Sequence, residues 1–452
     1  MTPADRLPLE TRRLLALAWP VVMTSLNWTL LHVTDVAVVG LVSTDQVAIL
    51  SASRSLSFIT IVAGLGFSSG ILVFAARADG AGELAASGRV LREGLILALG
   101  LGGALGLMLY CFAAPLLLGL GVAARLVPET AGIIRVLGLS YPLLMIIIAV
   151  SYFLEGISRP GRVMVVNLAI LPFNAVLAWA LSGGHFGLPV LGALGAVLAT
   201  AIAYGIGAAG MLLAVWTLPR AAARGVRDFS VLAWAGVGAG AWRLLRFGTV
   251  PAIASGLELV GFAVLIALST QLGDSVAHGF QIVFSIHNVI FSIALGLGSA
   301  AGVRVGNAVG EGQPAAAIPR TLIAVTIASV AIGLIALLLV LAAGPIVALF
   351  PATAAVHHVA LAMLVIWAPF IIFDGVQVVL VYALRSLGDQ VIAGINSIIA
   401  YFLVTGGLGL VLVQGGWGPT GLVLASGIGM VAAALLHAIR FYTISRRVRV
   451  QK

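Results

Sequence analysis

The apolar positions of this chain form long unbroken runs, not the short periodic stripes of a water-soluble protein. A helix needs about 20 apolar residues to cross the ~30 Å hydrocarbon core of a bilayer. Twelve runs of this length cover residues 14–40, 46–75, 88–118, 127–155, 161–183, 190–217, 242–272, 276–308, 316–346, 355–384, 391–413 and 418–445. The pattern predicts an all-α polytopic membrane protein with twelve transmembrane helices.

The composition supports the same fold class. Hydrophobic residues make up 61% of the chain and charged residues 9%, with a mean hydropathy of +1.18. A soluble domain carries about 25% charged residues. The longest hydrophilic stretch, about 218–241, is too short to fold alone. We therefore expect no separate soluble domain.

The net charge of +9 follows membrane topology and does not indicate a nucleic-acid partner. If the N-terminus is cytoplasmic, 21 of the 24 basic residues fall in tails and loops on the inner side. The exceptions are Arg54, Arg125 and Arg135. This asymmetry is the positive-inside rule. It predicts a multi-pass membrane protein with an even number of spans, both termini cytoplasmic and basic loops facing lipid headgroups.

An internal repeat appears at an offset of about 230 residues. Residues 64–66 and 296–298 both read Gly-Leu-Gly, Pro20 corresponds to Pro251, and Asn167 corresponds to Asn396. Six helices return a chain to its starting side, so such halves are related by a pseudo-two-fold axis along the membrane normal. We predict two six-helix bundles, an N-terminal lobe (1–217) and a C-terminal lobe (242–452), joined by a cytoplasmic linker (218–241).

Only three of the fifteen acidic residues lie deep inside the apolar runs, namely Asp35, Glu258 and Asp374. A carboxylate at bilayer depth costs several kcal/mol unless it faces a cavity or a partner, so such residues mark ion or proton pathways. These three residues are our candidate cation-coupling groups.

Glu258 and Asp374 have no basic neighbour on their own helices. Carboxylates in a medium of low dielectric constant can take up protons near neutrality. The same two carboxylates, with water and carbonyl oxygens, could instead be metal ligands for Na⁺, a hard cation that prefers oxygen. A third interpretation is that each neutral acid only forms a hydrogen bond between packed helices. The residues alone leave the coupling ion as H⁺ or Na⁺.

Asp35 has a second interpretation. It lies in the outer third of the first helix, and Arg54 lies at similar depth in the next, antiparallel helix. Asp35 is therefore either a proton-handling group or the partner of Arg54 in a structural ion pair. An ion pair would keep the carboxylate ionised.

Other chemistries are not indicated. No phosphate-binding loop of the ATPase type is present, Cys111 is the only cysteine, and no nucleophile–base constellation occurs at helical spacing. We predict that the protein is not an enzyme and needs no cofactor beyond its coupling ion.

Several motifs, taken in order, resemble the MATE (multidrug and toxic compound extrusion) family over the whole chain. They are Asp35-Val-Ala-Val-Val-Gly40, the paired Gly-Leu-Gly segments, Val303-Arg304-Val305-Gly306 with Gly310-Glu311-Gly312, Phe373-Asp374-Gly375-Val376-Gln377, and the run from Ala383 to Asp389. The resemblance is greatest to the NorM-type branch. It implies exchange of cytoplasmic organic cations for external Na⁺ or H⁺.

The resemblance also implies site residues. In the NorM-type branch the acids on helices 7 and 10 form the cation site, and they match Glu258 and Asp374. Phe262 and Gln281 match residues that line the central cavity of that branch.

Asp35, Asn174 and Thr200 match polar positions used for coupling in the other prokaryotic branch, and we expect Asn174 and Thr200 to line the substrate cavity as well. The acid that follows the Asn in that branch is Ala178 here, which favours the C-terminal lobe. Phe370 replaces a Tyr that is frequent in the NorM-type branch, which favours H⁺ over Na⁺.

We therefore expect a secondary antiporter that exports drugs or toxic metabolites by alternating access and works as a monomer. Its partners would be small cationic, amphipathic substrates and the lipid bilayer. The alternative is a lipid-linked oligosaccharide flippase of the same superfamily, which would need a cationic cavity for pyrophosphate. The buried charges are mainly acidic, so they favour cationic cargo.

Overall fold

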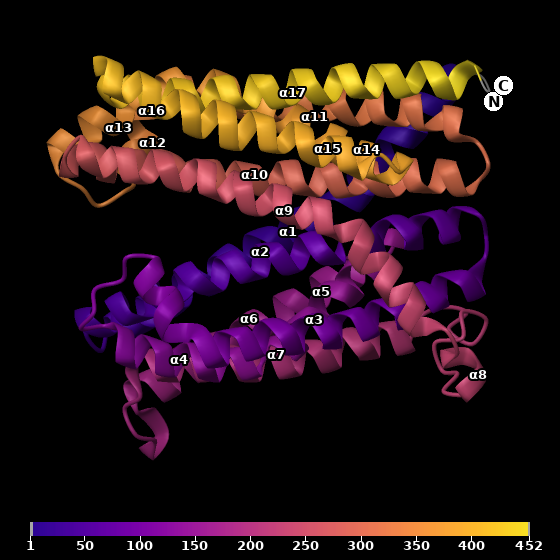
Figure 1. Cartoon of the computed structure of the whole chain (residues 1–452), viewed down its shortest axis with the longest axis horizontal. Coiled ribbons are helices and arrows are strands. Elements are labelled where there is room, and N and C mark those ends of the chain that lie inside the picture. Colours follow the sequence, from indigo (N-terminus) through magenta and orange to yellow (C-terminus); the bar gives the residue numbers. More distant parts are fainter. Residues whose placement is uncertain (1–2, 451–452) are drawn as a thin grey trace. The chain divides into compact units, whose positions relative to one another are not determined.

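The computed structural model describes residues 3–450, and the side chains of residues 8–448. Within this range all regular structure is helical (Figure 1). The α-helices are α1 (Pro3–Gly40), α2 (Thr44–Gly80), α3 (Leu84–Gly119), α4 (Val127–Leu139), α5 (Tyr141–Gly156), α6 (Pro160–Gly183), α7 (Gly192–Trp216), α8 (Val231–Trp234), α9 (Val237–Gln271), α10 (Asp274–Gly310), α11 (Ala317–Leu341), α12 (Ala343–Ala348), α13 (Ala354–Trp367), α14 (Ile371–Leu387), α15 (Gln390–Ser397), α16 (Gly409–Leu412) and α17 (Gly418–Val450). Short 3₁₀ turns are η1 (His185–Gly187), η2 (Pro314–Ala316) and η3 (Ala368–Phe370), and η4 (Ile398–Leu408) and η5 (Val413–Trp417) are π-helical.

The number of membrane-crossing segments agrees with the sequence. In the described chain, 10 helical stretches are long and apolar enough to cross a membrane, and the bent pair α4–α5 brings the number to 11. The last stretch, Gln390–Val448, has 59 residues, far more than one crossing needs. Gly416 and Gly418 interrupt it with positive φ angles of 82° and 52°. Divided there, it supplies two crossings, and the predicted all-α polytopic fold class is confirmed.

Two of the predicted helices are broken. The run 127–155 bends by 51° between α4 and α5, where Pro142 stands in the first turn of α5. The run 355–384 is interrupted by η3, which contains Pro369. Proline lacks an N–H and its ring collides with the preceding turn, which accounts for both breaks. As a result α14 begins only three residues before Asp374.

The helices form two compact units. The first unit comprises residues 23–252, and the second joins the chain up to Val22 with the chain from Ile253 onward. The starting halves of α1 and α9 each belong to the unit that holds most of the other half of the chain. The unit boundaries lie inside these two helices, shortly after Pro20 and Pro251.

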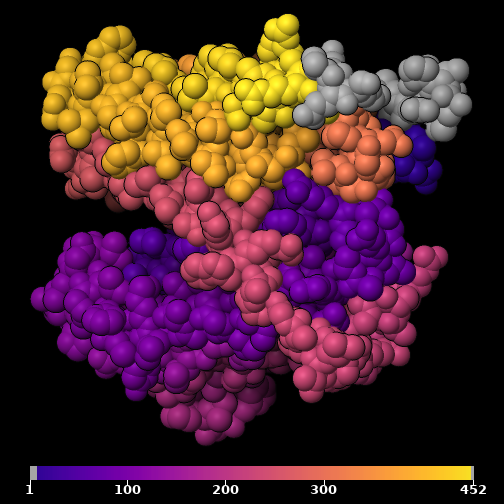
Figure 2. Space-filling view, turned by 45° about the vertical axis from the view of Figure 1, so that its right-hand side comes forward, coloured from indigo at the N-terminus to yellow at the C-terminus, as the bar shows by residue number. Residues whose placement is uncertain are grey.

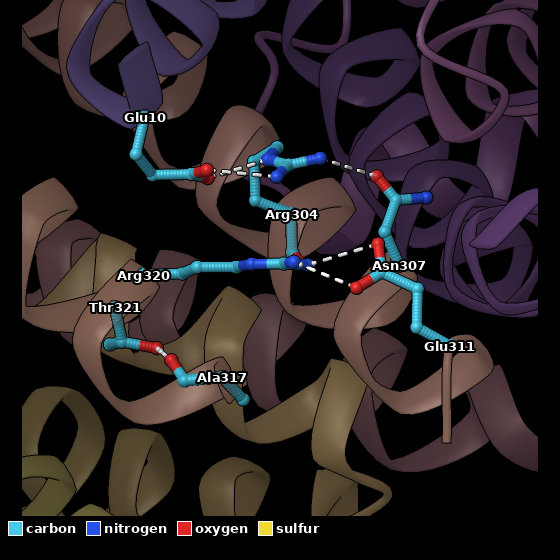
Figure 3. A network of polar contacts seen from close by, with 7 residues as sticks. All are labelled: Glu10, Arg304, Asn307, Glu311, Ala317, Arg320 and Thr321. Atoms are coloured by element: carbon cyan, nitrogen blue, oxygen red, sulfur yellow. Dashed lines mark hydrogen bonds and ion pairs between the residues drawn. The ribbon is translucent and has the colours of Figure 1, made fainter. Parts of the chain in front are cut away.

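The start of α1 is held in the second unit by a bidentate ion pair (Figure 3). The Arg304 guanidinium of α10 donates to both Glu10 carboxylate oxygens, at 2.6 and 2.8 Å. Arg304 also donates to the Asn307 side-chain oxygen at 3.3 Å. Beside this network Arg320 pairs with Glu311 at 2.8 Å. Further along α1, apolar side chains continue the contact, with Leu14 and Ala18 buried against Leu297 and Ala300.

The start of α9 is likewise held in the first unit by arginine–glutamate ion pairs. Arg243 of α9 pairs at 3.0 Å with Glu93 of α3, and Arg89 pairs with the same carboxylate at 3.2 Å. The Arg243 guanidinium also lies over the Phe74 ring, 4.8 Å from its centroid. Glu10 and Glu93 are therefore buried acids whose charge is compensated by arginine.

The segment predicted as a linker, 218–241, is packed against the first unit over much of its length (pink in Figure 2). Arg224 donates to Asp79 at 2.9 Å and also to the Ser87 hydroxyl. Arg92 donates to the Gly225 carbonyl oxygen at 2.8 Å. The segment is thus an ordered part of the unit, and it is most exposed just before and within α8.

Candidate functional site

Asp374 is the centre of a buried polar cluster in the second unit. It lies in the first turn of α14, is only 4% exposed, and faces α10, which packs along α14. One carboxylate oxygen, Oδ2, lies 3.0 Å from His287 Nε2. The other, Oδ1, accepts hydrogen bonds from the Tyr401 hydroxyl at 2.9 Å and the Gln377 amide at 3.2 Å. Both oxygens are therefore within hydrogen-bonding distance of side chains that can donate hydrogen bonds.

His287 of α10 is the partner of Asp374 that can either donate or accept a hydrogen bond through the same atom. If the carboxylate is ionised, Nε2–H donates to it, and if the carboxylic acid is protonated, a bare Nε2 accepts from it. The imidazole is buried and surrounded by aromatic rings. Their centroids lie 5.3 to 5.9 Å from its own and belong to Phe262, Phe284, Phe291 and Trp367. The pair is thus a proton-holding group inside an apolar, aromatic wall.

Tyr401 reaches Asp374 because of an unusual backbone. It lies on the π-helical segment η4. π-Helical geometry is rare in proteins, and where it occurs it is often found at functional sites. Gly261 of α9 packs directly on this segment, and a Cβ at Gly261 would stand 2.1 Å from the Tyr401 carbonyl oxygen. Glycine at 261 therefore permits the close approach of α9 and η4 that positions the Tyr401 hydroxyl.

The other predicted residues of the second unit lie at different distances from this cluster. Glu258 of α9 is partly exposed and within electrostatic range of Asp374, so a bound proton or cation would relieve their repulsion. Phe262 belongs to the aromatic wall, with its ring centroid 5.9 Å from that of Tyr401. Gln281 is exposed and, among the described residues, does not hydrogen-bond to Asp374.

Asp35 is the centre of a second polar cluster, in the first unit. It is 1% exposed, and Arg54 Nη2 of α2 lies 2.7 Å from its Oδ2. Thr200 of α7 donates to the same oxygen at 3.2 Å, and Asn174 of α6 donates to the Thr200 hydroxyl at 3.4 Å. The ion pair that the sequence offered as one of two interpretations is formed. The predicted residues Asn174 and Thr200 do join Asp35.

Three members of the Asp374 cluster were not predicted as site residues: His287, Tyr401 and Gln377. His287 lies well inside the apolar run 276–308. A test for any titratable group at bilayer depth, rather than for acids alone, would have found it. Among the described residues, no three His, Cys, Asp or Glu side chains gather as ligands of a metal ion.

A helical chain with this many crossings and hydrogen-bonded carboxylates buried between them is a membrane transporter by class. The chain belongs to the MatE family, whose model matches residues 20–180 and 251–409. One matched stretch lies in each predicted lobe. The family assignment also agrees with the expectation that the protein is not an enzyme.

Similar sequences and similar solved structures agree with this family assignment. The chain is 29% identical to the probable multidrug resistance protein NorM of Bradyrhizobium diazoefficiens, over 98% of this chain and 96% of the relative. It is 30% identical to the corresponding protein of Xanthomonas campestris, over 99% and 96%. The fold matches that of the eukaryotic MATE transporter AtDTX14 with a TM-score of 0.86 at 21% identity, covering 98% and 99% of the two chains. The predicted resemblance to the NorM-type branch is confirmed.

Proposed function

We propose that this protein exports organic cations from the cytoplasm in exchange for external H⁺ by alternating access. The observation that carries the proposal is the buried Asp374 carboxylate, shared among His287, Tyr401 and Gln377. The names of its NorM relatives support a multidrug cargo. We place the protein in a bacterial inner membrane as a monomer with cytoplasmic termini.

The donor set around Asp374 favours H⁺ over Na⁺. Na⁺ needs several oxygen ligands with free lone pairs, as hard cations do. Here an imidazole nitrogen faces Oδ2, while an amide N–H and a hydroxyl donate to Oδ1. Admitting Na⁺ would require these donors to turn away, whereas Asp374 can become protonated with its partners in place, because a bare His287 Nε2 accepts from the carboxylic acid.

The aromatic wall suits a lipophilic cation. Phe262, Phe284 and Phe291 surround His287, which in turn contacts Asp374. A cation over an aromatic face gains roughly 0.5–2 kcal/mol, more when it is desolvated. Combined with negative charge on Glu258 and Asp374, such a surface selects substrates by charge and hydrophobicity and does not require a specific shape.

Exchange follows from competition for the same carboxylates. A ligand shifts a conformational equilibrium only through its different affinity for the two states. If protons and the organic cation each neutralise Glu258 and Asp374, either one permits the conformational change, but the two do not bind together. If two protons, one for each carboxylate, enter for every monovalent cation that leaves, one net positive charge moves inward, which is worth about 2.3 kcal/mol per 100 mV, and the membrane potential then helps to drive export.

The test is dye-cation transport in inverted membrane vesicles under an imposed H⁺ or Na⁺ gradient. We expect wild-type transport with the H⁺ gradient and its loss in Asp374→Asn and in Glu258→Gln/Asp374→Asn. Asp274→Asn, an exposed acid at the start of α10, is the control and should transport normally.

Two results would contradict the proposal. Transport driven by Na⁺ alone would overturn the H⁺ coupling. Wild-type protein that moves no cation under either gradient would overturn the cationic cargo and favour the flippase alternative.

A further inference from the structure

Arg54 is a positive charge at membrane depth that is fixed from two directions. Its Nη2 pairs with Asp35, and its Nη1 donates to the carbonyl oxygen of His32, one turn earlier on α1. Arg54 itself belongs to α2, so the guanidinium joins the two helices. A guanidinium stays charged at any physiological pH, and this one is bonded within its own unit.

The atoms around Asp35 form a set that a small cation would use. The Asp35 Oδ1 and Asn174 Oδ1 atoms are buried and, within residues 8–448, have no hydrogen-bond partner. The Thr200 hydroxyl links the two residues. A carboxylate, an amide carbonyl and a hydroxyl are oxygen ligands of the kind that hard cations prefer. In this structure the charge that meets the carboxylate is the guanidinium of Arg54.

We propose that Arg54 is a tethered cation that occupies the Asp35 cluster in place of a monovalent metal ion. Its replacement by a neutral side chain would convert Asp35, Asn174 and Thr200 into a Na⁺ site. The inference deepens the proposed function and rests on it, because a carboxylate neutralised by a tethered charge has nothing to exchange during turnover. Arg54 thereby leaves ion coupling to the cluster around Asp374.

The physical reason is the cost of an uncompensated buried carboxylate. Removing one partner of a buried ion pair leaves a charge that must be neutralised from elsewhere. In Arg54→Gln, with Na⁺ present at pH 8, the cation is the neutralising species for which oxygen ligands already stand in place. Arg54→Lys keeps a tethered positive charge and should leave the site closed to Na⁺.

The test is thermal unfolding of the purified full-length protein in detergent at pH 8, in NaCl and in choline chloride of equal concentration. For Arg54→Gln we expect Na⁺ to raise the Tm by about 2 °C or more, because a ligand of the folded state raises its stability. Arg54→Lys should respond to Na⁺ as the wild type does. The double variant Arg54→Gln/Asp35→Asn should lose the extra response, since its carboxylate is gone.

The proposal is overturned if Arg54→Gln unfolds at the same temperature in both salts, or if the double variant retains the Na⁺ response. Should Arg54→Gln fail to fold, Arg54→Ala is purified with methylguanidinium, a free analogue of the missing group. We then expect methylguanidinium to raise the Tm of Arg54→Ala and not that of Arg54→Ala/Asp35→Asn. Equal effects on both, or none, would also overturn the proposal.

Failure of the proposed function would look different. If the wild type itself is stabilised by Na⁺ and Asp374→Asn abolishes that response, the H⁺ coupling is wrong. The role of Arg54 is still decided by the difference between Arg54→Gln and Arg54→Lys, because these variants share an unchanged Asp374 cluster.

Discussion

Each unit has a candidate coupling carboxylate buried among hydrogen-bond donors, Asp35 in the first and Asp374 in the second, and the two differ in the charge of their partners. Asp35 faces the guanidinium of Arg54, which carries a permanent positive charge. Asp374 faces an imidazole, a phenol and an amide, none of which carries a permanent charge. We infer that a carboxylate with a permanent counter-charge is a structural group, whereas one without such a counter-charge can exchange a cation. Burial alone therefore does not identify a coupling acid.

The largest expected effect comes from removing the Asp374 carboxylate, and removal of the Asp35 carboxylate is the comparison. Asp374→Asn should reduce H⁺-driven efflux in vesicles to the level of vesicles without the protein, because the exchanging charge is lost. Arg54→Gln/Asp35→Asn removes the other pair as a neutral unit and should retain at least half of the transport. If the two variants lose transport equally, the distinction between the clusters does not hold.

Replacing His287 by glutamine tests the titratable partner. Glutamine keeps a polar donor near Asp374 but has no charge change, and positioned acid–base groups typically contribute about 10²-fold or more. We expect efflux to fall by at least about 10-fold. His278→Gln, an exposed histidine on the same helix, is the control. Unchanged efflux in His287→Gln would exclude the imidazole from proton handling.

A smaller effect is expected from displacing Tyr401 without changing it. A methyl group at position 261 would collide with the Tyr401 backbone, and overpacking of this kind costs about 1–3 kcal/mol. Gly261→Ala should therefore lower both the Tm and the rate of efflux. Gly256→Ala lies on the same helix with open space around its Cβ and should change neither. Identical behaviour of the two variants would remove the π-helical segment from the account.

The smallest effect on transport, with a clear effect on stability, should come from the arginine pairs that hold α1 and α9. The Arg304 side chain is 10% exposed, whereas that of Arg243 is 56% exposed. Losing one partner of a buried pair costs about 3–5 kcal/mol. Removal of Arg243 should cost less, because Glu93, which is itself buried, keeps its ion pair with Arg89. Thermal unfolding in detergent should show a larger drop in Tm for Arg304→Gln than for Arg243→Gln. The reverse order would show that exposure does not rank these permanent pairs.

Much of the fold could be predicted from the length of the apolar runs. The breaks at Pro142 and Pro369 could not, because prolines are tolerated within membrane helices when neighbouring groups satisfy the freed carbonyls. Pro20 and Pro251 do lie inside continuous helices. The starting halves of α1 and α9 were assigned by sequence order, whereas their arginine pairs place each with the other half of the chain.

The candidate site was predictable where charge is costly. Asp35, Glu258 and Asp374 stand out because ionised groups are rare in lipid. Matching depth along antiparallel helices identified Arg54 as a partner of Asp35, and the ion pair is present. Tyr401 was missed because a buried tyrosine is ordinary in a membrane helix, and its approach to Asp374 depends on a π-helical backbone and on Gly261 of a distant helix. A single sequence does not specify such helix rotations.

The most direct test of the central claim is proton release on substrate binding. Tetraphenylphosphonium, a cation without a titratable group, is added to detergent-purified protein in a weakly buffered solution while the pH is recorded. The account predicts that wild type and Arg54→Gln/Asp35→Asn release protons alike and that Glu258→Gln/Asp374→Asn releases none. Release that persists in Glu258→Gln/Asp374→Asn, or that disappears with the Asp35–Arg54 pair, would contradict it.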